Sequence, residues 1–116
     1  MKTETGGLIA AILLFAGATF AADLGTAKDS YTTFCVKCHG ASGKGDGPSA
    51  ATLKTKPRDF TDCDRMAKIS DDLMFKVIKE GGESASLSKD MPSWKEGFED
   101  AEIHDLVAYL RTLCKK

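Results

Sequence analysis

The sequence has almost no excess of charge of either sign. Its 16 Lys and Arg residues nearly balance its 17 Asp and Glu residues, which leaves a net charge of −1. Binding to nucleic acid requires a positive field that displaces counterions from the phosphates. We therefore expect no nucleic-acid partner for this protein.

The sequence also lacks strand patterns and internal repeats. No segment alternates apolar and polar residues over a sustained length, and no repeated unit is visible. A chain of 116 residues has room for one domain with a small core. We therefore predict a single all-α domain.

The N-terminus has the three-part layout of a secretory signal peptide: a basic residue, an apolar run and a stretch of small residues. These parts are Lys2, residues 8–15, and Ala18, Ala21 and Ala22. Cleavage after Ala21 would place Thr19 and Ala21 in the small-residue positions. We therefore predict a signal peptide at residues 1–21, a mature domain at residues 22–116 and a periplasmic location.

An uncleaved membrane anchor is the alternative. Glu4 lies in the region that is normally positive, and the uncharged run 6–22 is just long enough to span a membrane. Only with this anchor would we expect the protein to associate with a membrane. No cysteine precedes Cys35, so a lipid-modified N-terminus is excluded. Export would place the thiols in a compartment where disulfides persist.

Three amphipathic segments predict helices. The first covers residues 23–34, the second follows Ser70 as N-cap and stops at Gly81-Gly82, and the third runs over about 99–113. Their apolar faces are Leu24, Ala27, Tyr31 and Phe34; Leu73, Met74, Val77 and Ile78; and Ile103, Leu106, Val107, Leu110 and Leu113. The loops between them are long for so small a domain, which indicates a large buried ligand.

The segment Cys35-Val36-Lys37-Cys38-His39 is the one sharp motif. Two cysteines at this spacing can each add to one vinyl group of a single haem, and the histidine that follows can bind the iron through Nε2. We therefore predict one covalent haem c, attached through Cys35 and Cys38, with His39 on the iron.

Other uses of the cysteine pair explain less of the sequence. A thioredoxin-like redox pair requires a βαβ context that is missing. A structural zinc site needs two further ligands, whereas Cys63, His104 and Cys114 are scattered singly. A disulfide between Cys35 and Cys38 would leave the adjacent histidine and the long loops unexplained.

Over nearly the whole mature region the chain resembles the class I c-type cytochromes, which are small bacterial monohaem electron carriers. The matching residues are Ala27, Tyr31 and Phe34 of the first helix, the attachment motif at 35–40, the loop Met91-Pro92-Ser93-Trp94 and the final helix at 103–113. The resemblance implies the cytochrome c fold, in which the first and last helices cross and, with a middle helix and long loops, surround one haem. It also implies an electron-transfer protein and not an enzyme.

The second axial ligand of the iron has four candidates: Met66, Met74, Met91 and His104. Met74 falls on the apolar face of the middle helix, which is typical of a core filler. Met66 has no supporting loop, and helical phase puts His104 on the flank of its helix. Met91 lies in a loop and precedes a proline that stiffens the chain, so we predict coordination of the iron by His39 and Met91.

Further contacts with the haem follow from the resemblance. It implies that the carbonyl of Pro48 accepts the Nδ1 proton of His39 and so fixes the imidazole ring. Lys56, Arg58 and the indole N–H of Trp94 are candidate donors to the haem propionates. Each of these three residues is explained equally well as a surface or core residue.

Cys63 and Cys114 remain once the haem is attached, and the family pattern usually has no cysteine at either place. In an oxidising compartment we expect a disulfide between them. Two reduced thiols or an intermolecular bond are the alternatives.

Two axial protein ligands would leave the iron without an open site, so we expect a monomeric carrier that transfers one electron at a time. Donor and acceptor redox proteins would dock transiently at the haem edge. Four lysines could rim this edge: Lys37, Lys44, Lys54 and Lys56. The alternatives are a membrane-anchored haem subunit of a respiratory complex and a haem-based sensor or ligand binder with a labile Met91.

Overall fold

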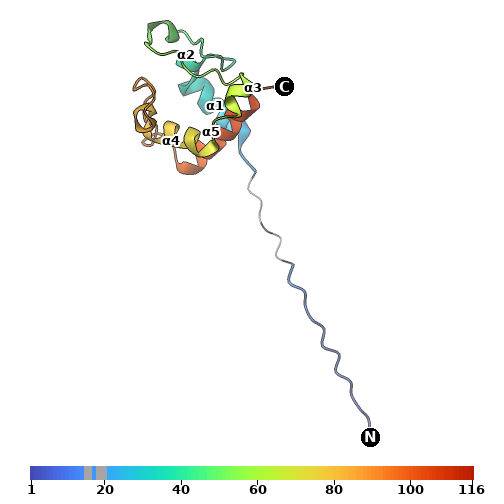
Figure 1. Ribbon diagram of the computed structural model, residues 1–116. Helices are drawn as coiled ribbons and strands as arrows, with labels where there is room; N and C mark the ends of the chain where they lie inside the picture. Colours follow the sequence, from blue (N-terminus) through green and yellow to red (C-terminus); the bar gives the residue numbers. More distant parts are fainter. Residues whose placement is uncertain (15–16, 18–20) are drawn as a thin grey trace.

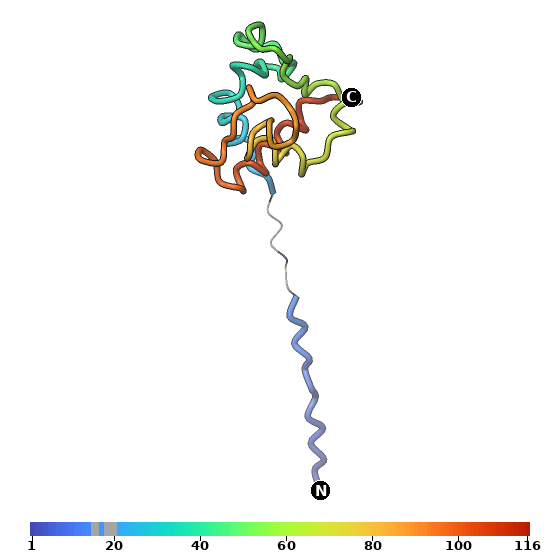
Figure 2. The backbone as a smooth tube through the Cα atoms, turned by 60° about the vertical axis from the view of Figure 1, so that its left-hand side comes forward, coloured from blue at the N-terminus to red at the C-terminus, as the bar shows by residue number. Residues whose placement is uncertain are grey.

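The computed structural model describes residues 1–14, 17 and 21–116. Residues 1–14 have no regular secondary structure, and their side chains are exposed where they lead away from the helical body (Figures 1 and 2). Phe15, Ala18 and Thr19 of the expected signal peptide lie outside the described residues. Within the described ranges, no helix is long and apolar enough to cross a membrane. The boundary after Ala21 stays a prediction.

Helices form the regular structure of the described residues, which contain no strand, so the prediction of an all-α fold is confirmed. The α-helices are α1 (Leu24–Phe34), α2 (Val36–His39), α3 (Cys63–Met66), α4 (Asp71–Glu80) and α5 (Asp100–Thr112). Two 3₁₀ turns, η1 (Ala50–Thr52) and η2 (Gly82–Ala85), lie in the loops. The three long helices match the predicted segments, whereas the short elements were not predicted.

The long helices begin at side chains that satisfy their free backbone N–H groups. A carboxylate oxygen of Asp23 accepts the N–H of Thr26 at 2.9 Å, and Ser70 Oγ accepts the N–H of Leu73 at 3.1 Å. Glu99 and Glu102 form a capping box at the start of α5. Because these contacts are local in sequence, the helix starts could be predicted without knowledge of the fold.

The core forms where the first and last helices meet. α1 packs against α5, and α4 packs against α5 and η2 (Figure 1). Tyr31 of α1 and Ile103 of α5 are almost completely buried. The rings of Tyr31 and Tyr109 lie 5.4 Å apart between centroids. α1 therefore holds the start of the cysteine motif directly against α5.

Arg111 ties α5 to the segment between α3 and α4. Its Nη1 donates to the carbonyl of Met66 at 2.7 Å, its Nη2 donates to the carbonyl of Ile69, and its Nε lies 2.8 Å from a carboxylate oxygen of Asp71. The planar guanidinium therefore binds three acceptors on one segment at once, which an ammonium group cannot do in the same geometry.

A disulfide joins the same two regions. Cys63 at the start of α3 is bonded to Cys114 after α5, and their Cα atoms lie 5.1 Å apart. Cys35 and Cys38 are free thiols in this structure. The four cysteines therefore divide into one structural pair and one pair available for other chemistry.

We expect Arg111→Ala to lower the free energy of unfolding by about 1–3 kcal/mol, because two backbone carbonyls would lose a charged donor. Urea unfolding followed by circular dichroism measures this loss. Arg65→Ala is the matched control, since Arg65 makes only an exposed pair with Asp62 at 3.7 Å. Equal losses in the two variants would contradict the role assigned to Arg111.

We expect the double variant Cys63→Ser/Cys114→Ser to unfold at lower urea concentration, with a loss of about 4 kcal/mol at most, because the unfolded chain is no longer closed into a loop. Mass spectrometry of denatured, unreduced protein after thiol alkylation tests the bond itself. Uptake of alkyl groups by both Cys63 and Cys114 would show that the disulfide is absent.

Candidate functional site

The cysteine motif is held in a single helical turn. Cys35 ends α1 and also precedes α2, and its carbonyl accepts the N–H groups of Cys38 at 3.3 Å and His39 at 2.9 Å. Gly40 ends the turn with a φ of 83°, a conformation that favours glycine. Two thiols and one imidazole therefore come from five consecutive residues in a fixed local geometry.

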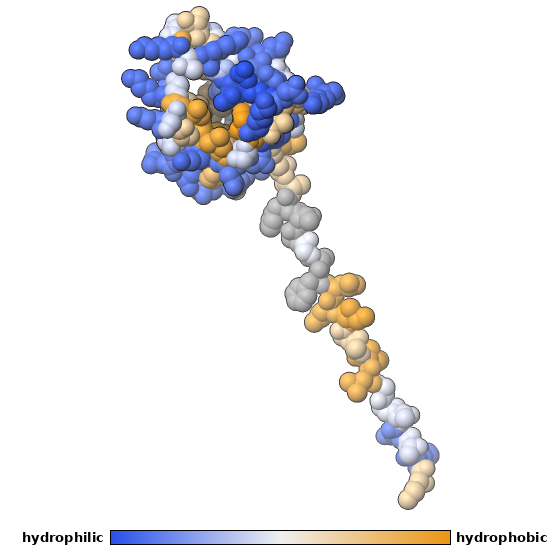
Figure 3. Space-filling model, in the orientation of Figure 1, coloured by the Kyte–Doolittle hydropathy of each residue, from blue (hydrophilic) through white to orange (hydrophobic). Residues whose placement is uncertain are grey.

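An apolar cavity opens beside this turn. Figure 3 shows it as a hollow in one face, with hydrophobic residues at its edge. Every α-helix except α3 contributes to the site, since α2 provides His39 and the others provide apolar or aromatic walls. The lining residues are Tyr31, Cys35, His39, Phe60, Ile78, Met91, Trp94, Phe98, Leu106 and Leu110.

The His39 imidazole is positioned by one ring and one carbonyl. It stacks on Phe60 with 4.6 Å between the ring centroids, and its Nδ1 lies 3.3 Å from the carbonyl oxygen of Arg58. Burial lowers the pKa of His39, and the hydrogen bond to Arg58 opposes this shift. With its proton on Nδ1, the neutral ring keeps the Nε2 lone pair free for a metal.

The partner of Nδ1 in this structure differs from the expected one, Pro48. The neighbours of this proline, Gly47 and Ser49, donate their N–H groups to the carbonyls of Cys38 and Lys37 at 3.1 and 2.9 Å. These bonds hold the turn around Pro48 against the backbone of α2, and the segment after Pro57 supplies the carbonyl for the imidazole instead. In this structure the acceptor of the Nδ1 proton is Arg58 and not Pro48, and a role of Pro48 beside a bound haem stays a prediction.

The free thiols of Cys35 and Cys38 and their surroundings argue against two of the rival interpretations. Burial, with a smaller effect from nearby Cys38, raises the pKa of Cys35 to about 11. Cys35 is therefore a protonated thiol at neutral pH, whereas disulfide exchange uses the thiolate. No group of three or more His, Cys, Asp or Glu side chains that could hold a metal ion occurs within the described residues.

Met91 is the candidate axial ligand that shares the cavity with His39. Met66 and Met74 are buried in the core, with 2% and 7% of their surface exposed, and neither lines the cavity. His104 stacks on Phe75 with 4.3 Å between ring centroids and also lies outside the lining. The structure thus brings together His39 and Met91 and leaves the other three candidates elsewhere.

The predicted propionate donors are placed differently from one another. Trp94 lies on the cavity wall, where its ring centroid is 5.5 Å from that of Phe34 and 5.9 Å from that of Phe98. Arg58 meets the site through its backbone carbonyl, and Lys56 is exposed. Side-chain hydrogen bonding by these three residues to a ligand stays a prediction.

Sequence reasoning missed the polar role of Tyr31. Its buried hydroxyl donates to the carbonyl oxygen of Gly40 at 2.6 Å, and burial raises its pKa, so it remains a donor. The helical pattern placed Tyr31 on an apolar face but gave no signal for a partner nine residues away. Phe60 was also missed, because it lies in a loop with no periodic pattern.

The residues present fit a covalently bound haem c. Two free thiols at the required spacing precede a neutral histidine, and a methionine lies on the wall of the same cavity. The wall itself is built from aliphatic and aromatic side chains, which suit the faces of a porphyrin. Cys35 and Cys38 would hold the haem, and His39 would bind its iron.

Comparisons with known proteins agree with this chemistry. The family model for cytochrome c matches residues 26–114. The solved structure of "KustC0563 c-type cytochrome" is 28% identical, with a TM-score of 0.64, and the match covers 77% of this chain and 98% of that chain. No curated protein gives a significant match.

A second solved structure is a chain of the Kuenenia stuttgartiensis reducing HAO-like protein complex Kustc0457/Kustc0458. It is 28% identical with a TM-score of 0.66, and the match covers 85% of this chain but only 48% of that one. The family match spans the motif, the cavity and the helices apart from the first two residues of α1, so it covers the site as well as the fold. The chain belongs to the cytochrome c family, whose members transfer electrons through covalently bound haem c.

Proposed function

We propose that this protein is a periplasmic carrier of single electrons with one haem c, whose iron is bound by His39 and Met91. The observation that carries the proposal is the placement of these two side chains on the wall of one apolar cavity, next to Cys35. No other candidate ligand among the described residues lines that cavity. The coordination therefore rests on geometry as well as on the resemblance to class I cytochromes.

The roles of the protein groups follow from their chemistry. Cys35 and Cys38 would hold the cofactor by thioether bonds, and His39 and Met91 would bind its iron. When bound, the haem supplies an iron that alternates between the ferric and ferrous states. With both of these protein ligands bound, the iron would have no position for a substrate, so the proposed role is to conduct electrons and not to catalyse a reaction at the metal.

The surroundings of the site set how readily an electron is accepted. A methionine ligand favours the ferrous state relative to a second histidine and so raises the reduction potential. The hydrogen bond from His39 Nδ1 to the Arg58 carbonyl makes the imidazole a stronger donor to iron, which opposes this effect. The apolar walls disfavour additional charge in the cavity.

Redox partners would meet the protein at a small, transient interface. The exposed lysines Lys37, Lys44, Lys54 and Lys56 belong to α2 and the segment that follows it. In the proposed complex these lysines attract an acidic surface on the partner. We propose a monomer that exchanges partners rapidly, with no permanent subunit.

A haem domain of a larger assembly is the second candidate function. It is favoured by the similarity to a chain of the Kuenenia stuttgartiensis complex, of which this chain matches only 48%. An uncleaved N-terminal segment would also hold the domain on a membrane. Native gel filtration distinguishes the two candidates, because a carrier elutes as a monomer.

We expect the protein to contain one haem per chain, since one cysteine pair is available. The pyridine haemochrome spectrum of denatured protein should be that of a c-type haem, and the haem should remain with the chain after acid-acetone extraction. Replacing both Cys35 and Cys38 by Ala should abolish this covalent retention. Native protein without haem would overturn the proposed function.

We expect Met91→Leu to remove the far-red absorption band of the oxidised protein, which arises from sulfur bound to iron. Met74→Leu is the matched control, because it makes the same exchange at a buried methionine outside the cavity. The reduction potential should fall in the Met91 variant alone, as the thioether no longer stabilises the ferrous state. An unchanged band in that variant would exclude Met91 as the ligand.

We expect N-terminal sequencing of the protein from a periplasmic extract to begin at Ala22. Replacing Ala21 by a bulky charged residue, as in Ala21→Lys, should block cleavage because the position next to the cut requires a small side chain. Native protein that begins at Met1 and sediments with membranes would favour the anchored haem subunit.

A further inference from the structure

The loop that carries Met91 is attached to the last turn of α4. The final carbonyl groups of an α-helix have no partner within the helix. Here the carbonyl of Ile78 accepts the N–H of Trp94 at 2.9 Å, and the carbonyl of Lys79 accepts the N–H of Lys95 at 3.2 Å. The residues just after the methionine therefore cap the helix end.

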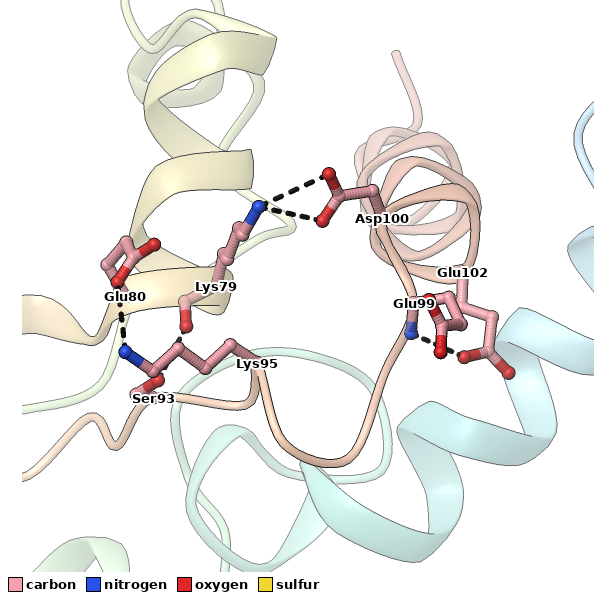
Figure 4. A network of polar contacts seen from close by, with 7 residues as sticks. All are labelled: Lys79, Glu80, Ser93, Lys95, Glu99, Asp100 and Glu102. Carbon is pink, nitrogen blue, oxygen red and sulfur yellow. Dashed lines mark hydrogen bonds and ion pairs between the residues drawn. The ribbon is translucent and has the colours of Figure 1, made fainter.

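One side chain adds to this backbone attachment. Ser93 Oγ donates to the carbonyl oxygen of Lys79 at 2.6 Å, as Figure 4 shows. The hydroxyl lies two residues after Met91, so it fixes the loop close to the sulfur-bearing residue. Ion pairs lie around this bond, from Lys79 to Asp100 at 2.9 Å and from Lys95 to Glu80 at 3.8 Å. They are exposed and contribute little by comparison.

The other side of the loop is held by close packing at Gly82. Its N–H donates to the carbonyl of Met91 itself at 2.9 Å. A Cβ atom on Gly82 would lie 2.1 Å from the carbonyl oxygen of Ser88 and 3.2 Å from the Cβ of Met91. Glycine is therefore required here by the approach of the loop, since no side chain fits between the two backbones.

We propose that Ser93 is a positioning residue for the axial methionine, and that it acts with Gly82 by making the Met91 loop the C-terminal cap of α4. This inference rests on the proposed ligation of iron by Met91. Breaking the Ser93 bond leaves the ligand in place but raises the fraction of time during which the loop is detached and the iron is open.

A positioning role and a purely structural role of Ser93 predict different effects of its replacement. Ser93 is exposed and its hydroxyl touches no ligand of the iron, so a purely structural role would change the stability of the fold alone. A positioning role also changes how often an external ligand reaches the iron. The loss of one hydrogen bond shifts such an opening equilibrium by about fivefold.

The experiment measures the rate at which carbon monoxide binds to the reduced holoprotein, since this ligand binds only when Met91 has left the iron. We expect Ser93→Ala to bind about fivefold faster than the wild type. Gly82→Ala should accelerate binding further and weaken the far-red band of the oxidised protein. Ser93→Thr keeps the hydroxyl and should restore the wild-type rate.

Thr112→Ala is the matched control. Its Oγ1 also donates to a backbone carbonyl at 2.6 Å, that of Tyr109, but it lies on α5 outside the cavity. This variant should leave the rate of carbon monoxide binding unchanged. Rates within twofold of the wild type in both the Ser93→Ala and the Gly82→Ala proteins would overturn the proposal.

The wild type separates this failure from a failure of the proposed function. A far-red band in the wild type that Met91→Leu removes establishes the ligand, whatever the Ser93 variants do. A wild type with no such band and immediate carbon monoxide binding would overturn the ligation by Met91 and the positioning role together.

Discussion

The site depends first on how the one-turn helix α2 is held against the core. Tyr31 makes this connection, because its ring packs on Tyr109 of α5 while its hydroxyl bonds to the carbonyl of Gly40. A buried hydroxyl without a hydrogen-bond partner would destabilise the protein by the free energy of its desolvation. The bond from Tyr31 therefore favours the position of the turn in which the carbonyl of Gly40 lies within reach. The packing of α1 on α5 therefore determines where the thiols and the imidazole lie.

The part of the site that contains Met91 is held by a separate set of contacts. The loop that carries Met91 is bonded to the end of α4, and α4 in turn packs on α5. α5 is thus the common reference for both axial candidates, although it contributes only Leu106 and Leu110 to the cavity wall. Arg111 and the Cys63–Cys114 disulfide fix its far end.

The sequence predicts those features that depend on local chemistry. Ser70 and the Gly81-Gly82 pair bound α4 because a cap and a stop act within a few residues. The proposed role of Cys35 as an attachment residue could likewise be inferred from the sequence, since the motif spans five residues. The placement of Met91 in a loop beside a proline could also be predicted without any knowledge of the fold, and its role as a ligand stays a proposal.

What the sequence does not predict depends on contacts between distant segments. The carbonyl that accepts the His39 proton belongs to Arg58, nineteen residues away, and backbone acceptors carry no signal in the residue type. From the sequence alone, Arg111 cannot be distinguished from an ordinary surface cation. Only the fold brings it to the carbonyls of Met66 and Ile69. The α3 turn is too short for any periodic pattern to reveal it.

The packing of α1 on α5 has a consequence for how the chain folds. These helices come from opposite ends of the described domain, so their contact has a high sequence separation and must close a long loop. The core cannot form on a partly synthesised chain, because α1 lacks its partner until α5 has been made. Such a chain stays unfolded for longer, which is the state in which the proposed export would move it across a membrane.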